Sequence, residues 1–488
     1  MSNTYRAPTL TQALLPIIIL VVLLVGAITV FGDNAIMGPN QMALLMAAAV
    51  AAMIARRNGH SWDELTGSIN RGIHNAMTAI VILLSVGSLI GVWILAGTVP
   101  SMIYYGLGLL SPEWFYLSAC LISAVVSLCV GSSWTTAGTI GVGLMGTATT
   151  MGLSPAMAAG AIISGAYFGD KMSPLSDTTN LAPGMAGSEL FEHIRHLVWT
   201  TFPSFIIAVV FFAFAGSPSS SGDMANLENV RQVMSQQFNT AWYLLLPLPI
   251  LLLAVARPLP ALPSIWIGIF AGIVFALVFQ QDNIAKLAGA ETGDVKALFT
   301  GVWMALTDGY ISSTGLAEVD DLLSKGGMSS MLNTVWLIMC AMTFGGLMER
   351  GGFLEAIVSR IVVFTRGARS MISSVVISAF ASNLITSDQY ISIVVPGRMF
   401  RNAFEKLKLH PVNLSRALED GGTVTSPLVP WNSCGAYMAA TLGVATLSYA
   451  PFAIFCLVNP IIAILSAIFM FKVIPANEAV NVKHAKEA

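Results

Sequence analysis

One stretch limits what this chain can fold into: the run Gly169–Pro183, GDKMSPLSDTTNLAP. It follows directly on small apolar residues, 156–166, that have the composition of half a membrane span. A helix that continued through the run would carry Asp170, Lys171 and Asp177 into hydrocarbon, where each charge costs at least about 2.5–3.5 kcal/mol. Two prolines in the run also remove backbone hydrogen-bond donors. The run therefore predicts an unwound break in a membrane helix, which is stable only where protein or an aqueous cavity surrounds it.

The composition of the whole chain indicates that this break lies in a membrane protein. Of the 488 residues, 55% are hydrophobic and 10% are charged, and the mean hydropathy is +0.76. Such a chain with many long apolar runs predicts an all-α polytopic protein of the plasma membrane, with the lipid bilayer as its solvent. No basic cluster indicates nucleic-acid binding, and the cysteines lack the spacing of a metal site or a disulfide framework. We expect no cofactor.

Apolar runs predict ten full spans, two of them broken, at roughly 12–31, 36–55, 74–97, 155–185, 197–215, 241–256, 262–279, 331–348, 412–445 and 451–471. Arginine and lysine concentrate in a few short segments, and positive charge marks the cytoplasmic side. This distribution predicts that both termini and the loops 56–73, 349–370 and 398–412 are cytoplasmic, and that the acidic segment 280–330 is outside. The first run lacks a cleavage-site pattern, so we expect a retained span rather than a signal peptide.

Two further apolar segments are interrupted by polar residues at their centres. Segment 371–397 carries Ser382–Tyr390 in its middle and has basic residues on both flanks. Because both flanks are then cytoplasmic, and each arm is too short to cross, we predict a hairpin that enters the membrane and returns. By correspondence, segments 113–130 and 137–151 predict a second re-entrant hairpin that enters from outside.

The two halves of the chain match each other at an offset of about 250 residues. Gly169-xxx-Ser-Pro-Leu recurs as Gly422-xxx-Ser-Pro-Leu, and four further residue pairs keep the same order: Ser132/Ser382, Thr136/Thr386, Gly91/Gly345 and Gly97/Gly351. The opposite arginine content of corresponding loops predicts inverted repeats, which with paired broken helices are typical of secondary transporters. We expect five regions: two N-terminal spans and an inner linker (1–73), a first repeat (74–215), linking spans and an acidic outer loop (216–330), a second repeat (331–472) and a cytoplasmic tail (473–488).

Carboxylates at membrane depth predict an ion-binding site. Asp177 in the first break and Asp388 at the second hairpin tip are the main predicted ion-binding carboxylates. Asp170 is a further predicted ion-binding residue, and it is also expected to pair with the adjacent Lys171. Neutral oxygens that suit a hard cation lie near them, on Ser173, Thr178, Asn180, Thr135, Thr136, Asn383, Thr386, Thr423, Ser426 and Asn432. We expect Na⁺ to be bound by a subset of Asp177, Thr178, Asn180, Thr386 and Asp388.

A structural explanation stays open for each of these groups. The carboxylates and Asn180 also suit helix caps, and each hydroxyl or amide also suits a bond back to a nearby carbonyl. Glu419 and Asp420 equally suit a solvated position at the inner membrane face. His193 and His196 are expected in a solvated inner loop.

A carboxylate beside neutral oxygens can bind either Na⁺ or H⁺, because burial favours the protonated form and a bound cation favours the ionised form. Competition for one carboxylate makes exchange obligatory if only the loaded forms change orientation, which is the chemistry of a cation/proton antiporter. An intramembrane aspartyl protease requires Tyr-Asp and Gly-x-Gly-Asp pairs that this chain lacks. A channel requires a continuous polar pore with rings of like groups, rather than two dissimilar half-sites.

Four motifs carry a resemblance to a known family: the run from Gly169 to Asn180, Ser387–Tyr390, Pro396–Phe400 and Pro427–Asn432. They resemble the NhaC family of Na⁺/H⁺ antiporters, and the likeness extends from about residue 10 to residue 472. The resemblance implies two inverted repeats, each with a re-entrant hairpin and a broken helix, and transport of Na⁺ and H⁺. The family also includes Na⁺-coupled exchangers of organic acids such as malate and lactate, and of amino acids. These remain alternatives for the second substrate, and a homodimer is a further expectation.

Overall fold

The structure is a computed structural model and describes residues 5–31, 35, 37–215, 224–256, 259–291, 293–363 and 367–476. Within these ranges the chain is helical, and its β-structure amounts to one isolated bridge between Leu409 and Pro475. Seven described helices are long and apolar enough to cross a membrane, or nine if two bent pairs each count as one span. The predicted all-α polytopic class is confirmed. The seven helices include two hairpin arms and leave out the broken spans, so they are not the same set as the ten predicted spans.

The helices of the first half follow the predicted spans closely. They are α1 (Leu10–Phe31), α2 (Pro39–Arg57), α3 (Trp62–Leu95), α4 (Thr98–Leu109), α5 (Phe115–Val130), α6 (Ser133–Thr136), a π-helical segment (Ala137–Gly141), α7 (Val142–Thr150), α8 (Pro155–Met172), α9 (Asp177–Ala186) and α10 (Leu190–Ala215). The linking region contains α11 (Met224–Gln237), α12 (Pro247–Ala256), α13 (Ala261–Phe279), α14 (Gln281–Ala288), α15 (Val295–Thr307) and α16 (Ala317–Leu323).

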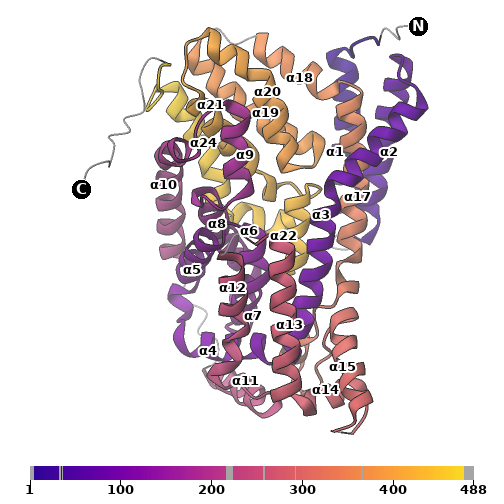
Figure 1. Cartoon of the computed structure of the whole chain (residues 1–488), viewed down its shortest axis with the longest axis vertical. Coiled ribbons are helices and arrows are strands. Elements are labelled where there is room, and N and C mark those ends of the chain that lie inside the picture. Colours follow the sequence, from indigo (N-terminus) through magenta and orange to yellow (C-terminus); the bar gives the residue numbers. More distant parts are fainter. Residues whose placement is uncertain are drawn as a thin grey trace.

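The second half has the same order of elements as the first. It comprises α17 (Leu332–Arg350), α18 (Phe353–Val363), α19 (Ala368–Thr386), α20 (Gln389–Lys406), α21 (Pro411–Leu418), a π-helical segment (Glu419–Thr423), α22 (Ser433–Leu442), α23 (Thr446–Tyr449) and α24 (Ile454–Ile468). A long helix, a helical hairpin, a broken helix and a closing helix thus occur once in each half. Figure 1 shows the second hairpin at one end of the molecule, with α18 and α21, and α4, α11, α14 and α15 at the other. The relation of the halves by inversion stays a prediction.

The long helix α3 begins earlier than predicted, at Trp62 instead of about residue 74. Ser61 caps it through a capping box with Glu64, whose carboxylate also accepts a 2.7 Å hydrogen bond from Arg350 of α17. The first turns of α3 are polar, so hydropathy alone assigns them to a loop. The cap makes them part of the helix. Closer to the core, α3 and α17 touch through glycine: a Cβ on Gly72 would lie 2.5 Å from the Met342 carbonyl oxygen.

The arms of the second hairpin are longer than predicted. The helix α19 has 19 residues and α20 has 18, so each is long enough to cross a membrane. The chain nevertheless reverses at Ser387, which adopts a left-handed conformation with φ 61°, and both Ser387 and Asp388 are buried. The reversal is thus set by the polar tip and its packing, and not by short arms.

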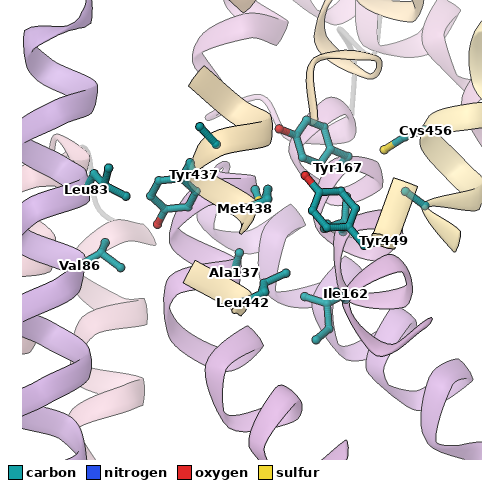
Figure 2. Close-up of a cluster of buried hydrophobic side chains, with 14 of the residues drawn as sticks. Leu83, Val86, Ala137, Ile162, Tyr167, Tyr437, Met438, Leu442, Tyr449 and Cys456 are labelled. Atoms are coloured by element: carbon teal, nitrogen blue, oxygen red, sulfur yellow. The ribbon is translucent and has the colours of Figure 1, made fainter. Parts of the chain in front are cut away.

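Aromatic residues join the two halves around α22. Tyr437 of α22 stacks on Trp134 of the first hairpin at 4.1 Å between ring centroids, and its hydroxyl donates to the Trp134 carbonyl oxygen at 2.9 Å. Figure 2 shows Tyr437 on one side of this helix, and Tyr167 of α8 beside Tyr449 on the other. The Tyr449 hydroxyl donates to the Pro427 carbonyl oxygen at 2.6 Å. These contacts pack α22, the second arm of the second broken helix, against the first half of the chain.

The described ends of the chain lie beside the loops that were predicted to be cytoplasmic. The Arg6 amide donates to the Asn58 carbonyl oxygen after α2, and the Ala476 amide donates to the Lys408 carbonyl oxygen after α20. The rest of the predicted tail, 477–488, lies outside the described residues.

Candidate functional site

The first break is shorter than the sequence predicts. The helix α8 continues through Met172 and α9 begins at Asp177, so only residues 173–176 are unwound rather than the whole run 169–183. Pro174 cannot donate to the helix, and the Ser176 side chain accepts from the Thr179 amide to start α9. Pro183 lies within α9, so the prediction that the break extends to Pro183 was wrong.

The tip of the first hairpin is seated on this break. The Asp170 carboxylate accepts a 2.9 Å hydrogen bond from the Ser133 amide, which is one of the free donors at the start of α6. The preceding turn passes through Gly131 at φ 72°, and a Cβ there would lie 2.6 Å from Leu175. Asp170 therefore caps the hairpin helix across the two elements.

The second half contains a similar junction between hairpin and break. Asn383 of α19 donates to the Gly422 carbonyl oxygen at 2.5 Å and to the Thr425 hydroxyl at 2.9 Å. Asn432 in turn donates to the Asn383 side-chain oxygen at 3.0 Å. These amides hold the hairpin onto the π-helical segment Glu419–Thr423 and the residues that follow it, up to Asn432.

Most of the predicted neutral ligands bond to nearby groups. The hydroxyls of Thr136 and Thr386 each donate to a carbonyl oxygen four residues earlier, at 2.9 Å, and that of Thr135 contacts the Ser132 hydroxyl at 3.1 Å. The remaining contacts are equally local: Ser426 hydroxyl to Thr423 carbonyl, Asn180 amide to Pro174 and Ser176 carbonyls, Leu175 amide to Ser173 hydroxyl, and Thr178 hydroxyl with Ser176 hydroxyl. Each hydroxyl oxygen still has a lone pair for a cation.

Asp177 and Asp388 lie on helices of the two halves, α9 and α20, that pack together. Asp388 is buried and caps α20, since its carboxylate accepts from the Ile391 amide at 2.9 Å. Asp177 is exposed at the start of α9. The Tyr390 side chain interacts electrostatically with Asp177, Asp388 and Asp170. The first break and the second hairpin, which are far apart in sequence, therefore come together.

Lys171 does not pair with Asp170, contrary to the expectation from sequence. Its ammonium lies 2.5 Å from the Asp420 carboxylate of the second half, and neither side chain is exposed at all. The ammonium also donates to Asn459 at 3.2 Å, and the Thr200 hydroxyl donates to the same Asp420 oxygen at 3.1 Å. Asp170 is directed instead to the hairpin tip, because adjacent residues on a helix point in different directions.

Glu419 and Asp420 are also not solvated at the inner face, since both are fully buried. The expectation for the histidines was wrong as well: His193 and His196 lie inside α10 and are buried, and His193 contacts the Ser415 hydroxyl at 2.8 Å. In each case the apolar neighbours come from a distant part of the chain, so a local charge pattern misjudged their depth.

Comparison with known proteins identifies the family. Residues 165–471, more than half of the chain, match the model of the Na⁺/H⁺ antiporter family. The chain is 40% identical over 423 residues to the Na⁺/H⁺ antiporter NhaC of Alkalihalophilus pseudofirmus, which covers 86% of this chain and 88% of the relative. The chain belongs to the NhaC family of Na⁺/H⁺ antiporters. The resemblance found in the sequence is thereby confirmed, and the family consists of secondary transporters, not enzymes.

Other relatives of the antiporter are named for organic substrates. The chain is 34% identical to the malate-2H⁺/Na⁺-lactate antiporter of Bacillus subtilis, over 92% of each chain. It is also 34% identical to the arginine/ornithine antiporter ArcD of Halobacterium salinarum, over 94% of this chain and 92% of the relative. Both alternatives for the second substrate are therefore represented among its relatives.

The motifs that carry the resemblance lie where the two halves of the antiporter meet. The run from Gly169 to Asn180 spans the first break, Ser387–Tyr390 is the second hairpin tip, and Pro427–Asn432 belongs to the second break. Sequence reasoning did not count Lys171, Glu419 or Asp420 as binding groups, and it left out Thr200 and Asn459. The depth of Glu419 and Asp420 gave no clear signal, because the helix before them, Pro411–Leu418, carries polar residues such as Asn413 and Arg416.

A cavity of about 430 Å³ opens at the end of the antiporter opposite the second hairpin. Its walls come from α3, α7, the end of α22 and the loop after α15. Most of the lining is apolar, and two charged residues, Asp308 and Lys325, reach it from the loop. The cavity is wide enough for a small organic molecule.

Proposed function

We propose that this antiporter exchanges Na⁺ for H⁺ by competition at carboxyl groups where its two halves meet, with alternating access from the two sides of the membrane. The plasma membrane and cytoplasmic termini complete the proposal, since the chain ends lie beside the arginine-rich loops. A bound Na⁺ or proton neutralises a carboxylate. The free-energy cost of moving the site through a low-dielectric region is therefore low only when an ion is bound.

The observation that carries this proposal is that α9 of the first break packs against α20 of the second hairpin. Asp177 starts α9 and Asp388 caps α20, so these two carboxylates lie on elements that pack together. Carboxylate and hydroxyl oxygens are the ligands that hard cations prefer. Na⁺ is proposed to bind there through Asp177 or Asp388, together with neutral oxygens of Thr178, Asn180 or Thr386.

A second candidate function is exchange of an organic acid or amino acid coupled to Na⁺. The outer cavity favours it, because Lys325 and Asp308 offer one charge of each sign on an apolar lining. A carboxylate or a zwitterion suits such a lining, whereas a bare cation needs a closely spaced set of oxygens.

Purified protein in liposomes tests both functions. A Na⁺ pulse outside should raise the internal pH, and raising Na⁺ should move the midpoint for proton binding to lower pH, as competition requires. Asp177→Asn should abolish this movement, while Glu405→Gln, an exposed glutamate on the last turn of α20, should leave it intact. Proton movement that appears only with internal malate, lactate or arginine would assign the second function. A wild-type protein that moves no protons in response to Na⁺ under any of these conditions would refute both.

A further inference from the structure

Among the buried carboxyl groups that the structure describes, Glu419 has the fewest hydrogen bonds. It lies in the π-helical segment Glu419–Thr423 and is fully buried, and neither of its carboxylate oxygens makes a hydrogen bond to a described residue. The Thr423 hydroxyl is buried and lacks a partner among the same residues. A buried carboxylate with open acceptors is costly unless a cation or a proton occupies it. π-Helical turns occur frequently at functional sites.

Both halves of the chain supply groups around this carboxyl. Thr423 from its own segment, and Thr178 from α9, which packs against that segment, lie near it without forming a hydrogen bond, and Lys171 and Asp170 of α8 interact with it electrostatically. Lys171 is already held by Asp420 and Asn459, so it does not close the open side of Glu419 as a direct partner. What remains is a carboxylate flanked by two hydroxyl oxygens, which is a ligand set for a small hard cation.

The charges around Glu419 are one cation short of neutrality. Lys171 and Arg416 contribute two positive charges, and Asp170, Glu419 and Asp420 contribute three negative charges, leaving a net charge of −1 when the α10 histidines are neutral. Arg416 is itself almost fully buried and interacts electrostatically with Asp420. Because water does not screen charges at this depth, one H⁺ or one Na⁺ bound to Glu419 makes the cluster neutral.

We infer that Glu419 is a further carboxyl group at which Na⁺ and H⁺ compete, and that Thr178 and Thr423 complete a Na⁺ site there. This inference rests on the proposed exchange and adds a second group at which it occurs. Na⁺ bound through Asp177 or Asp388 then passes to Glu419 on the same route. The Lys171–Asp420 pair holds α8 to the second broken helix, so that ligands from both halves stay together. Unloading the cation leaves a net negative charge in the protein core, which opposes reorientation of the empty carrier.

The decisive variant is Glu419→Gln, which keeps the shape and removes the charge. Its cluster is permanently neutral, so the protein should fold with unchanged or increased thermal stability in detergent. It should lose Na⁺-driven proton movement to the level of empty liposomes, and also the rise in melting temperature that Na⁺ gives the wild type. Glu405→Gln is the matched control and should behave as wild type. An E419Q protein that folds and still exchanges overturns the inference, and so does one that keeps the Na⁺-induced melting shift.

The hydroxyl ligands provide a test that a merely structural role would not pass. Thr423→Val should raise the Na⁺ concentration for half-maximal exchange by about 3- to 10-fold, the loss of one oxygen contact, and leave the pH dependence in the absence of Na⁺ unchanged. Thr423→Ser should restore wild-type Na⁺ dependence because the oxygen returns. Equal behaviour of the valine and serine variants would overturn the assignment of Thr423. A wild-type protein without Na⁺-dependent exchange would instead refute the proposed function itself, so the two failures are distinguishable.

Discussion

Replacing Asp420 with asparagine should destabilise the antiporter more than any other single removal of a carboxylate at the site. The Lys171 ammonium lies 2.5 Å from the Asp420 carboxylate with both side chains fully buried, so the substitution removes the carboxylate that contacts this ammonium, and Glu419 does not replace it as a direct partner. Breaking one side of a buried pair costs about 3–5 kcal/mol. Since about 1.4 kcal/mol is a factor of ten, the unfolding equilibrium constant should rise by two to three and a half powers of ten, roughly.

The neighbours of the Lys171–Asp420 pair determine how much folding stability each variant loses. Asn459 still accepts from Lys171 at 3.2 Å, which limits the loss, while the oxygen of the new asparagine can still accept from the Thr200 hydroxyl. Removing both charges together with Lys171→Met and Asp420→Leu should bring stability back to near wild type, because an apolar pair of similar volume replaces a desolvated ion pair at little cost. A double-mutant cycle then gives the coupling energy.

Unfolding of the purified variants in detergent, followed by size-exclusion chromatography after heating, measures these effects. Asp170→Asn is the comparison, because sequence alone assigned Lys171 to Asp170. Asparagine can still accept from the Ser133 amide, so this variant should lose only about 1 kcal/mol or less. If Asp170→Asn costs more stability than Asp420→Asn, or if the double variant is no better than the worse single one, the pairing described above is wrong.

Asp388→Asn should fold normally, because asparagine also caps helices well, but should lose Na⁺-dependent exchange in liposomes; retained exchange would remove Asp388 from the ion route. A cysteine at Lys296 should react with an impermeant thiol reagent added outside cells, and a cysteine at Glu405 should not; labelling of 405 from outside would turn the second hairpin into a crossing. In the outer loop, the Thr314 amide and neighbouring donors hold the pKa of Asp320 below its usual range. The ionised Asp320 carboxylate therefore stabilises the fold at pH values above its unfolded-state pKa, and this stabilisation is lost as the pH falls through its folded-state pKa. The hydrogen-exchange protection factor of the Thr314 amide should accordingly drop in acid, and also in the Asp320→Asn variant.

Much of the membrane architecture could be read from the sequence. Apolar length placed most helices, because a span needs about 20 apolar residues whatever its neighbours are. The charge and proline content of the run after Gly169 predicted a break, and the basic flanks of the second polar segment predicted a hairpin. These features depend on local composition and on the cost of charge in hydrocarbon.

The partners of the buried charges were decided only by the tertiary structure. Lys171 has a carboxylate as its sequence neighbour, yet it pairs with Asp420, which lies in the other half of the chain. Helix geometry directs adjacent side chains apart, and the packing of the two broken helices decides which distant group each one meets. No local pattern contains that information.

The same reason explains why a solvated position stayed open for Glu419 and why Asp177 was expected at membrane depth. Hydropathy measures how a segment partitions between water and lipid, and so it predicted where the helices lie. Whether a charge within a segment faces water, lipid or protein depends on the elements that cover it. Here α19, α20, α24 and α9 pack against the π-helical segment that carries Glu419, while Asp177 at the start of α9 stays exposed. The sequence by itself thus determined that charges lie within this membrane protein, and the packing of its two halves determined which of them lack a partner.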